Sequence, residues 1–496
     1  SETTGGVSAW VLGEQLSSGN PVLAGADRVL VVESRAALSR RPYHRQKLHH
    51  QLVAMRAFSR RMEAAGAVVD HRAAPDMRTG LAAHVREHRP DVVRLLAPTG
   101  HEAARSLGAL PTVELVPGTL FLTDEAEFSA WLDGRSRLVM EDFYRRQRVR
   151  LDVLMDGDRP IGGRWNLDAD NREPPPRDRR PPAPRRPEEG DLDAEVRRDL
   201  DAMGLSTFGL DGPRRWPATP EESDAMLEDF ATRRLPDFGR YQDAMLAGER
   251  TMWHACISAA LNVGVLDPLA CVRRAERAFA EGAAPLAAVE GFVRQIIGWR
   301  EYVHGLWHAL DGEGLNALCA DAPLPAPFTG AARTRMACLS DALDGVARTA
   351  YAHHIERLML FGNLMLLLGV RPDAALEWFR SVFVDAFDWV MAPNVLGMAL
   401  HADGGRMMTK PYAAGGRYVQ RMSDHCGGCE YRPTERTGAR ACPFTVLYWD
   451  FIARHRERFR RDPRMSRAVA GLDRLDPSEV GDLRARASRL RVHFDA

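Results

Sequence analysis

The first 120 residues alternate between short apolar runs and longer amphipathic stretches, and this alternation restricts the possible folds more than any other feature. The apolar runs, rich in β-branched and aliphatic side chains, lie at residues 7–12, 28–33, 67–71, 91–96 and 112–116. Residues 43–65, between the second and third runs, place Leu48, Leu52 and Met55 at helical spacing. Strands that alternate with such helices form βαβ units on a parallel sheet. We therefore predict an α/β domain with a Rossmann-like parallel sheet over residues 1–135.

The first predicted strand is not followed by a Gly-x-Gly-x-x-Gly segment. In dinucleotide-binding proteins that segment brings backbone amides and a helix N-terminus to the pyrophosphate. The sheet therefore resembles a Rossmann domain in topology only, and any ligand of this domain must be held in another way.

Residues 171–191 read NREPPPRDRRPPAPRRPEEGD. Proline at this density prevents a helix, and the segment has almost no apolar side chains to pack, so it is typical of a linker. We place it inside an interdomain connection over residues 136–215. Two interpretations are open: a solvated tether, or an arginine-rich loop close to nucleic-acid phosphates.

Helical periods dominate the chain beyond residue 210. Amphipathic stretches cover residues 220–233, 286–310, 335–368 and 373–390, and few β-rich runs interrupt them. No internal repeat of fixed period occurs. This pattern predicts a large all-α domain over residues 216–496.

Charge and cysteine content narrow the functional classes. Lys+Arg and Asp+Glu both number 67, so contact with nucleic acid requires a local basic patch. Seven cysteines are too few for a secreted disulfide framework of this length and favour reduced thiols or metal ligands. The chain has no long apolar run, and residues 1–6 lack the features of a signal peptide. We expect a cytoplasmic protein that does not enter a membrane.

Three cysteines form a compact pattern near the C-terminus. Cys426 and Cys429 flank two glycines, and Cys442 follows after twelve residues, directly before a proline. Such spacing is typical of a metal centre, and it leaves both zinc and an iron–sulfur cluster open. Adjacent His425 is interpreted as a neighbour of the centre. The candidates for a fourth ligand are Cys256, Cys271, Cys319 and Cys338.

Three segments of the helical half carry recognisable motifs. They are FVRQIIGWREY at 292–302, AYAHHIERLM at 350–359 and DAFDWVMAPNV at 385–395. In order and separation they resemble the FAD-binding half of photolyases and cryptochromes. The resemblance extends over essentially the whole chain. The segments that match the bacterial iron–sulfur (6-4) photolyases and their cryptochrome relatives are GGRWN at 162–166, TKPYAA at 409–414 and RMSDHC at 421–426.

This resemblance implies the photolyase/cryptochrome fold and a light-driven enzyme that acts, as a monomer, on UV-damaged DNA. In such repair an electron passes from excited reduced FAD to a pyrimidine photoproduct that is flipped out of the duplex. The resemblance also implies a 4Fe–4S cluster and selects its fourth ligand. The cluster ligands would be Cys338, Cys426, Cys429 and Cys442.

The resemblance further assigns roles to single residues. Arg357 would pair with Asp385 beside the isoalloxazine ring, and Arg300 would face the cofactor. The other cofactor-binding residues are His254, Ser258, Met391 and Asn394. The substrate-binding residues are Trp299 and Met398, and the electron-transfer residue is Trp378.

His353 and His354 are assigned to catalysis, with Tyr412 beside the lesion. In (6-4) repair an oxygen atom moves between two bases, and a protonated imidazole is a suitable proton donor near neutral pH. Outside this motif, two adjacent histidines in a helix are more often packing or surface residues. The essential histidine of the subgroup corresponds to His354.

The sequence departs from the family pattern at the flavin and along the electron path. Met391 stands opposite flavin N5, where relatives have Asn, Asp or Glu, and it cannot make a charged or amide hydrogen bond. Phe379 and Phe328 replace residues that are often Tyr and Trp, and phenylalanine is much harder to oxidise. We therefore expect slow photoreduction or a different electron path.

The family also binds a 6,7-dimethyl-8-ribityllumazine antenna in the N-terminal sheet. Glu33 matches this pattern, whereas Glu14 and the loop at residues 39–44 depart from it. The sequence therefore leaves antenna binding open.

Two other functions compete with repair. A cryptochrome-type photoreceptor would use the same flavin for signalling, and Met391 leaves room for it. An iron–sulfur nucleic-acid binder related to primase large subunits would explain the cysteines but not the flavin motifs.

Overall fold

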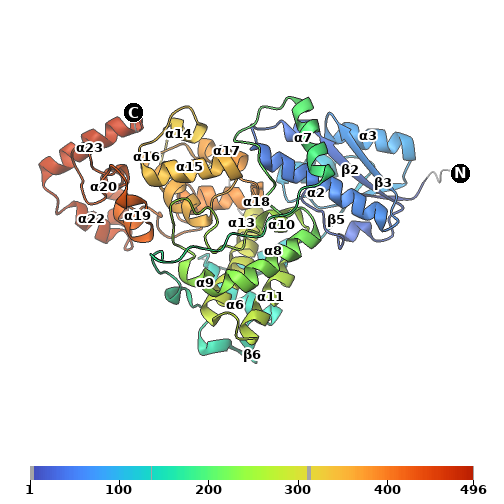
Figure 1. The fold of residues 1–496 in the computed structure, drawn as a ribbon, viewed down its shortest axis with the longest axis horizontal. Helices are drawn as coiled ribbons and strands as arrows, with labels where there is room; N and C mark the ends of the chain where they lie inside the picture. The colour runs from blue at the N-terminus through green and yellow to red at the C-terminus, as the bar shows by residue number, and fades with distance from the viewer. Residues whose placement is uncertain (1–4, 136, 310–313, 495–496) are drawn as a thin grey trace.

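The computed structural model describes residues 5–135, 137–309 and 314–494, and its N-terminal domain is built on a five-stranded sheet (Figure 1). The strand order is β3-β2-β1-β4-β5, and every neighbouring pair is parallel. The strands are β1 Val7–Trp10, β2 Arg28–Ser34, β3 Val69–Ala74, β4 Val92–Leu96 and β5 Val113–Val116. All five predicted strands and the parallel sheet are confirmed.

Helices cover both faces of this sheet, because alternate residues of a strand point to opposite sides. Val29 and Val31 of β2 pack in one cluster with Phe58, whereas Leu30 packs in another with Leu81. The former cluster lies under α2 and the latter under α3. The helices of this domain are α1 Arg35–Leu38, α2 Arg45–Ala64, α3 Met77–His88, α4 His101–Gly108 and α5 Glu125–Leu132, with a short 3-10 turn, η1, at Pro21–Leu23.

Helix α2 also connects the two domains. His44 precedes it, and its Nδ1 accepts a hydrogen bond from the Gln46 amide. Its Nε2 lies 3.0 Å from the carbonyl oxygens of both Val346 and Ala347 in the helical domain. Burial lowers the pKa of His44 to about 4, so the ring is neutral and donates one proton across the interface.

The connection between the domains has regular elements on either side of an irregular segment. These are α6 Met140–Leu151, β6 Met155–Asp156, β7 Arg159–Pro160, η2 Ile161–Gly163, η3 Asp168–Asp170 and α7 Asp191–Met203. Between η3 and α7 the proline–arginine segment forms no helix or strand. It is anchored to the helical domain by ion pairs of Arg172 with Asp243 and of Arg179 with Asp237. We call this segment the proline–arginine strap, because it follows the surface of the helical domain at these points.

The rest of the chain is helical, as predicted, and α23 lies at the opposite end of the long axis from the sheet (Figure 1). The helices and turns are α8 Pro220–Arg233, α9 Leu235–Tyr241, α10 Ser258–Val263, α11 Pro268–Ala280, α12 Leu286–Val293, η4 Arg294–Arg300, α13 Glu301–Ala309, α14 Ala326–Thr329, α15 Ala337–Thr349, η5 Glu356–Gly362, α16 Asn363–Leu368, α17 Pro372–Val382, α18 Asp388–Ala392, η6 Pro393–Ala399, α19 Gly416–Met422, η7 His425–Gly427, α20 Pro443–Arg454, α21 Arg456–Arg460, α22 Ser466–Leu472 and α23 Pro477–Val492. Within the described ranges, no helix combines the length and apolarity needed to span a bilayer.

Two stretches predicted as continuous helices are in fact broken. The period over 335–368 is interrupted after α15, where Ala350 adopts a left-handed φ of 54°. The period over 373–390 is interrupted between α17 and α18, where Phe383 and Phe387 are extended. The amide of Val384 donates to the carbonyl of Ala350 at 2.9 Å. The two breaks are thus bonded to each other, a long-range contact that no local periodicity can reveal.

Candidate active site

Each of the three motifs of the helical domain overlaps a π-helical turn. These are η4, η5 and η6, which occupy Arg294–Arg300, Glu356–Gly362 and Pro393–Ala399. The π turn is rare and occurs mostly at functional sites, because it changes the direction of the side chains that follow it. Turn η6 contacts both η5 and α13, and α13 continues η4, so the three turns converge.

A buried ion pair of Arg357 and Asp385 lies at this convergence. Arg357 Nη1 and Nη2 lie 2.9 and 3.2 Å from the two oxygens of Asp385. The hydroxyl of Ser258 donates to Asp385 Oδ2 at 2.6 Å, and the Asn262 amide donates to the Asp385 carbonyl at 2.8 Å. The predicted pair of Arg357 and Asp385 therefore exists, and the Ser258 hydroxyl points at the same carboxylate.

Burial alone would raise the pKa of Asp385. The charge and hydrogen bonds of Arg357, together with the Ser258 hydroxyl, outweigh it and hold the pKa below its ordinary value. The carboxylate is therefore ionised at neutral pH.

Lys47 reaches this site from the other domain. Its Nζ donates to the carbonyl oxygens of Ala386 at 2.5 Å and Arg380 at 3.0 Å. Burial lowers the pKa of Lys47 to about 7. Helix α2 thus holds the loop that carries Asp385.

Three histidines meet next to the ion pair. The rings of His254 and His353 are stacked with centroids 4.9 Å apart, and His354 meets His254 edge-on at 5.1 Å. Burial lowers the pKa of His353 and of His254 well below the ordinary value. Both rings are therefore neutral and shielded from solvent, whereas the side chain of His354 is 50% exposed.

The two histidines that were assigned to catalysis have different surroundings in the structure. His353 Nε2 faces the carboxyl of Glu356 at 3.8 Å, and burial raises the pKa of Glu356 to about 8. His354 Nε2 instead lies 3.4 Å from Asp243 Oδ1 at the surface. Burial alone would raise the pKa of Asp243, but its contact with His354 outweighs burial and lowers it.

Tyr412 belongs to the same rim as Asp243. Burial raises the pKa of Tyr412, and the neighbouring charges that act on it are Arg172, Asp168 and Asp243. Arg172 Nε lies 3.9 Å from Asp243 Oδ2. The start of the proline–arginine strap therefore borders His354 and Tyr412.

Trp299, Arg300 and Met398 form a second group around Trp389. Trp299 and Met398 pack in one apolar cluster with Trp389. The Arg300 guanidinium lies 4.0 Å from the centroid of the Phe121 ring and donates to Glu301 at 2.7 Å. This group presents a mostly aromatic wall.

Met391 and Asn394 lie on the segment between Asp385 of the ion pair and Met398 of the aromatic group. Met391 is 4% exposed and shares a core cluster with Trp378. The side-chain amide of Asn394 donates to the Val390 carbonyl at 2.8 Å.

Trp378 is surrounded by phenylalanines. Its centroid lies 5.0 Å from that of Phe328, 5.1 Å from Phe379 and 5.6 Å from Phe383. The Arg357 guanidinium stacks on Phe383 at 4.0 Å. The aromatic contacts run from Trp378 to the ion pair, but every ring that touches Trp378 here is a phenylalanine.

Several buried nitrogens at this site have no hydrogen-bond partner among the described residues. They are Nδ1 and Nε2 of His353, Nε2 of His254 and Nε of Arg300. Buried polar groups in native proteins are nearly always paired. These atoms are therefore available to a polar ligand.

Four cysteines line one apolar cavity. Cys338 comes from α15, Cys426 and Cys429 from the loop at η7, and Cys442 from the residue before α20. Cys256 and Cys271 are buried in a different core cluster, and Cys319 is exposed. The structure thus brings together the four cysteines that the resemblance selected. His425 borders the same cavity, and its Nε2 lies 3.2 Å from Asp341 Oδ2.

The thiols of this cavity are difficult to ionise in the absence of a cation. Burial raises the pKa of Cys338 well above the ordinary value, and it raises that of Cys426 to about 11 and that of Cys442 to about 12. A bound metal would supply the positive charge that stabilises thiolates.

The two carboxylates considered for the antenna, Glu33 and Glu14, already have hydrogen-bond partners within the α/β domain. Glu33 accepts hydrogen bonds from Arg56 at 2.7 and 2.9 Å and faces His71 at 2.8 Å. Glu14 accepts from the amide and hydroxyl of Thr99. A carboxylate offers about four acceptor positions, so Glu33 keeps roughly one for a ligand.

Sequence reasoning missed four residues of the site: Lys47, Asp243, Asn262 and Glu356. Only Lys47 carried a signal, because it is one of two lysines in a chain whose other basic residues are arginines. The others are ordinary polar residues that tertiary contacts bring to the histidines and to Asp385.

Comparison with known proteins places this chain in one family. The sequence model of a family described as "Deoxyribodipyrimidine photo-lyase-related protein" matches residues 9–216. A (6-4) photolyase of Agrobacterium fabrum is 38% identical over 98% of this chain and 99% of its own length. An uncharacterised protein of Acanthamoeba polyphaga mimivirus is 32% identical over 21% of this chain and 76% of its own.

A solved structure agrees with the fold. A bacterial class III photolyase from Agrobacterium tumefaciens aligns with a TM-score of 0.58 at 15% identity, covering 99% of this chain and 98% of that one. The chain belongs to the photolyase family.

Proposed function

We propose that this protein is a light-driven DNA repair enzyme, a (6-4) photolyase that restores pyrimidines from (6-4) photoproducts in UV-damaged DNA. The observation that carries the proposal is the position of His354. It is half-exposed and paired with an ionised Asp243 directly outside the buried site of Arg357 and Asp385. A full-length relative that is named a (6-4) photolyase supports the same reading.

We infer that FAD is the cofactor, and that when bound and reduced it supplies the photoexcited electron. Arg357 and Asp385 would hold its ring system, and the unpaired nitrogens of His254 and Arg300 would meet its polar edges. Ser258, Met391 and Asn394 would complete the contacts. The orphaned buried nitrogens support this fit, because a flavin carries both acceptors and donors.

Side chains of the protein would then supply the proton that repair requires. With Nε2 held against Asp243, His354 would deliver a proton from Nδ1 to the oxygen that moves between the bases. Asp243 would orient the imidazole. His353 is neutral and buried, so its role would be to position His354 and the ligand, with Glu356 protonated beside it. Tyr412 would stand at the lesion, and Trp299 with Met398 would pack against the flipped bases.

We infer that the four cysteines hold a 4Fe–4S cluster in preference to zinc. In a tetrahedral zinc site, Zn–S bonds of 2.3 Å place the sulfurs about 3.8 Å apart. Of the described residues, no three His, Cys, Asp or Glu ligand atoms at this cavity lie within 4.8 Å of one another. The wider spread supports a cluster, whose iron atoms separate the thiolates.

The experiment that tests the proposal gives the reduced protein blue light and oligonucleotides with either a (6-4) or a cyclobutane lesion. Restored pyrimidines are quantified by chromatography. We expect light-dependent restoration of the (6-4) lesion and loss of it in His354→Ala, with flavin still bound. His493→Ala, at an exposed histidine directly after α23, is the matched control and should repair at the wild-type rate.

Restoration of neither lesion by the flavin-loaded wild-type protein would refute repair and favour the photoreceptor alternative. Full repair by His354→Ala would refute its role as the acid.

A further inference from the structure

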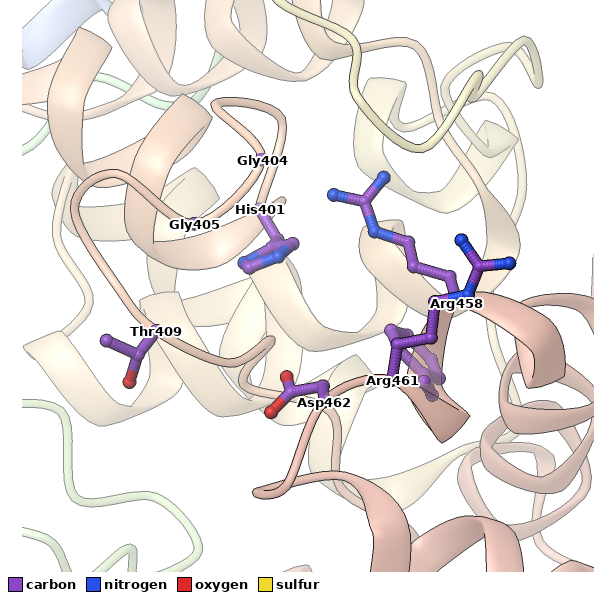
Figure 2. Close-up of a pocket in the computed structure, with 8 residues that line it drawn as sticks. His401, Gly404, Gly405, Thr409, Arg458, Arg461 and Asp462 are labelled. Atoms are coloured by element: carbon purple, nitrogen blue, oxygen red, sulfur yellow. The ribbon is translucent and has the colours of Figure 1, made fainter.

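A second cavity, of about 360 Å³, lies outside the site described above. It is formed by the loop after η6 and by α21 with the turn that follows it (Figure 2). Its lining residues are His401, Gly404, Gly405, Thr409, Arg458, Phe459, Arg461 and Asp462. Apart from Phe459, the side chains that line it are polar or charged.

His401 lies in the middle of the residues that line the cavity (Figure 2). It is 5% exposed, and its Nδ1 is buried without a hydrogen-bond partner among the described residues. Its backbone has a left-handed φ of 51°, which is uncommon for a residue other than glycine. Gly405 lies against the ring, so that an added Cβ would be 3.2 Å from His401 Cε1. A strained backbone thus fixes an unpaired imidazole at the cavity.

The cavity has an excess of unengaged positive charge. Arg461 has no side-chain partner within the described part of the chain, and Arg458 donates one hydrogen bond, to the Ala317 carbonyl at 2.6 Å. Arg464 lies at the edge, where it donates to the Thr409 hydroxyl. The acidic residue of the lining, Asp462, caps the turn by accepting from the Arg464 amide at 2.8 Å.

This arrangement suits a phosphate group. Guanidinium groups, a hydroxyl and a neutral imidazole are the groups that bind phosphodiester oxygens in protein–DNA complexes. Because the net charge of the chain is zero, such contacts must come from a local cluster of this kind.

The cavity is close to the residues assigned to the lesion. His401 follows Met398 by three residues, and Thr409 precedes Tyr412 by three. Three residues span at most about 10 Å. That length corresponds to roughly three base steps of a duplex with a rise of 3.4 Å.

We propose that this cavity binds a backbone phosphate of the damaged DNA, within about three nucleotides of the flipped lesion. The proposal rests on the proposed function and names a contact that fixes the strand beside the active site.

The test measures binding of a fluorescent duplex to the holoprotein in the dark, over a series of salt concentrations. Arg458→Gln/Arg461→Gln should weaken binding about tenfold at low salt and reduce the salt slope by about 0.9, the value for one phosphate. Arg105→Gln, an exposed arginine of α4 on the other domain, is the control and should change neither quantity. Unchanged affinity and slope in the double variant would overturn the proposal.

A second pair of variants tests the imidazole. Asn tolerates a left-handed φ and keeps a hydrogen-bond donor, so His401→Asn should retain more affinity than His401→Leu. Equal affinity of both variants and wild type would overturn the role of His401.

Titration with inorganic phosphate or a nucleoside monophosphate distinguishes the source of the phosphate. Saturable binding of either that depends on Arg461, with DNA affinity unchanged, would overturn the assignment to DNA. The dark binding assay does not depend on repair. If the wild-type protein binds DNA through Arg461 but repairs neither lesion, the proposed function is refuted while the phosphate site at His401 is retained.

Discussion

The Asp385 carboxylate offers the sharpest test of the candidate site, because its charge can be removed without changing its shape. Asp385→Asn leaves the Arg357 guanidinium, 16% exposed, without its partner. Removal of one member of a buried ion pair costs about 3–5 kcal/mol. Since Arg357 keeps some solvent contact and Asn can still accept one hydrogen bond, we expect the lower end, about 3 kcal/mol. That corresponds to roughly a 150-fold change in the unfolding equilibrium.

The assay is urea-induced unfolding of the flavin-loaded protein, followed by circular dichroism and by flavin release. Ser258→Ala should cost less, about 1.5 kcal/mol, because it removes a single hydrogen bond to a charged group. The double variant Arg357→Met/Asp385→Asn should lose less than the sum of the single variants, since it buries no unpaired charge. Glu102→Gln, which breaks an exposed pair with Arg40, is the control and should change stability by less than about 1 kcal/mol.

Two results would refute this reasoning. One is a cost of Asp385→Asn that does not exceed that of Glu102→Gln. The other is strict additivity of the Arg357 and Asp385 substitutions.

Three further predictions concern protons, metal and electrons. Because burial raises the pKa of Glu356 from 4.5 to about 8, its contribution to stability is complete below about pH 4.5 and is lost as the pH rises through 8. Glu356→Gln should therefore match wild type in urea unfolding near pH 5 and exceed it near pH 9; parallel pH profiles would contradict this. Cys338→Ala should lose iron and acid-labile sulfide in a colorimetric assay while Cys319→Ala retains both, and stoichiometric zinc in the wild type would exclude the cluster. Phe379→Tyr, which places an oxidisable ring beside Trp378, should accelerate flavin photoreduction, measured by flavin absorbance during illumination. Phe494→Tyr is its control, and equal rates in both would argue against this electron path.

The sheet was predictable because its signal is local. Each strand is a short apolar run bounded by polar turns, and burial on both faces of a parallel sheet requires such runs. The same holds for α8, whose predicted limits agree with the structure because Thr219 caps its first turn and Pro220 occupies the first position.

The breaks in the helical domain were not predictable. The amphipathic period continues through Ala350 and through residues 383–387, yet the chain leaves the helix at both places. The hydrogen bond from Val384 to Ala350 and the ion pair of Asp385 with Arg357 compensate for the lost helical bonds. A pattern of single residues contains no information about such partners, and the same is true of the three π turns.

By itself, the sequence determined the α/β sheet, the helical second half and, through its motifs, most of the residues that could act on a flavin and a lesion. Only the tertiary structure showed how the surroundings of His353 and His354 differ, because the burial of His353 and the contact of His354 with Asp243 depend on residues far away in the sequence. The tertiary structure also showed that Cys338 lies beside the C-terminal cysteines, and it revealed the cavity at His401. Spacing along the chain specifies which groups are present, whereas burial and long-range contacts decide which of them are charged, paired or free to bind.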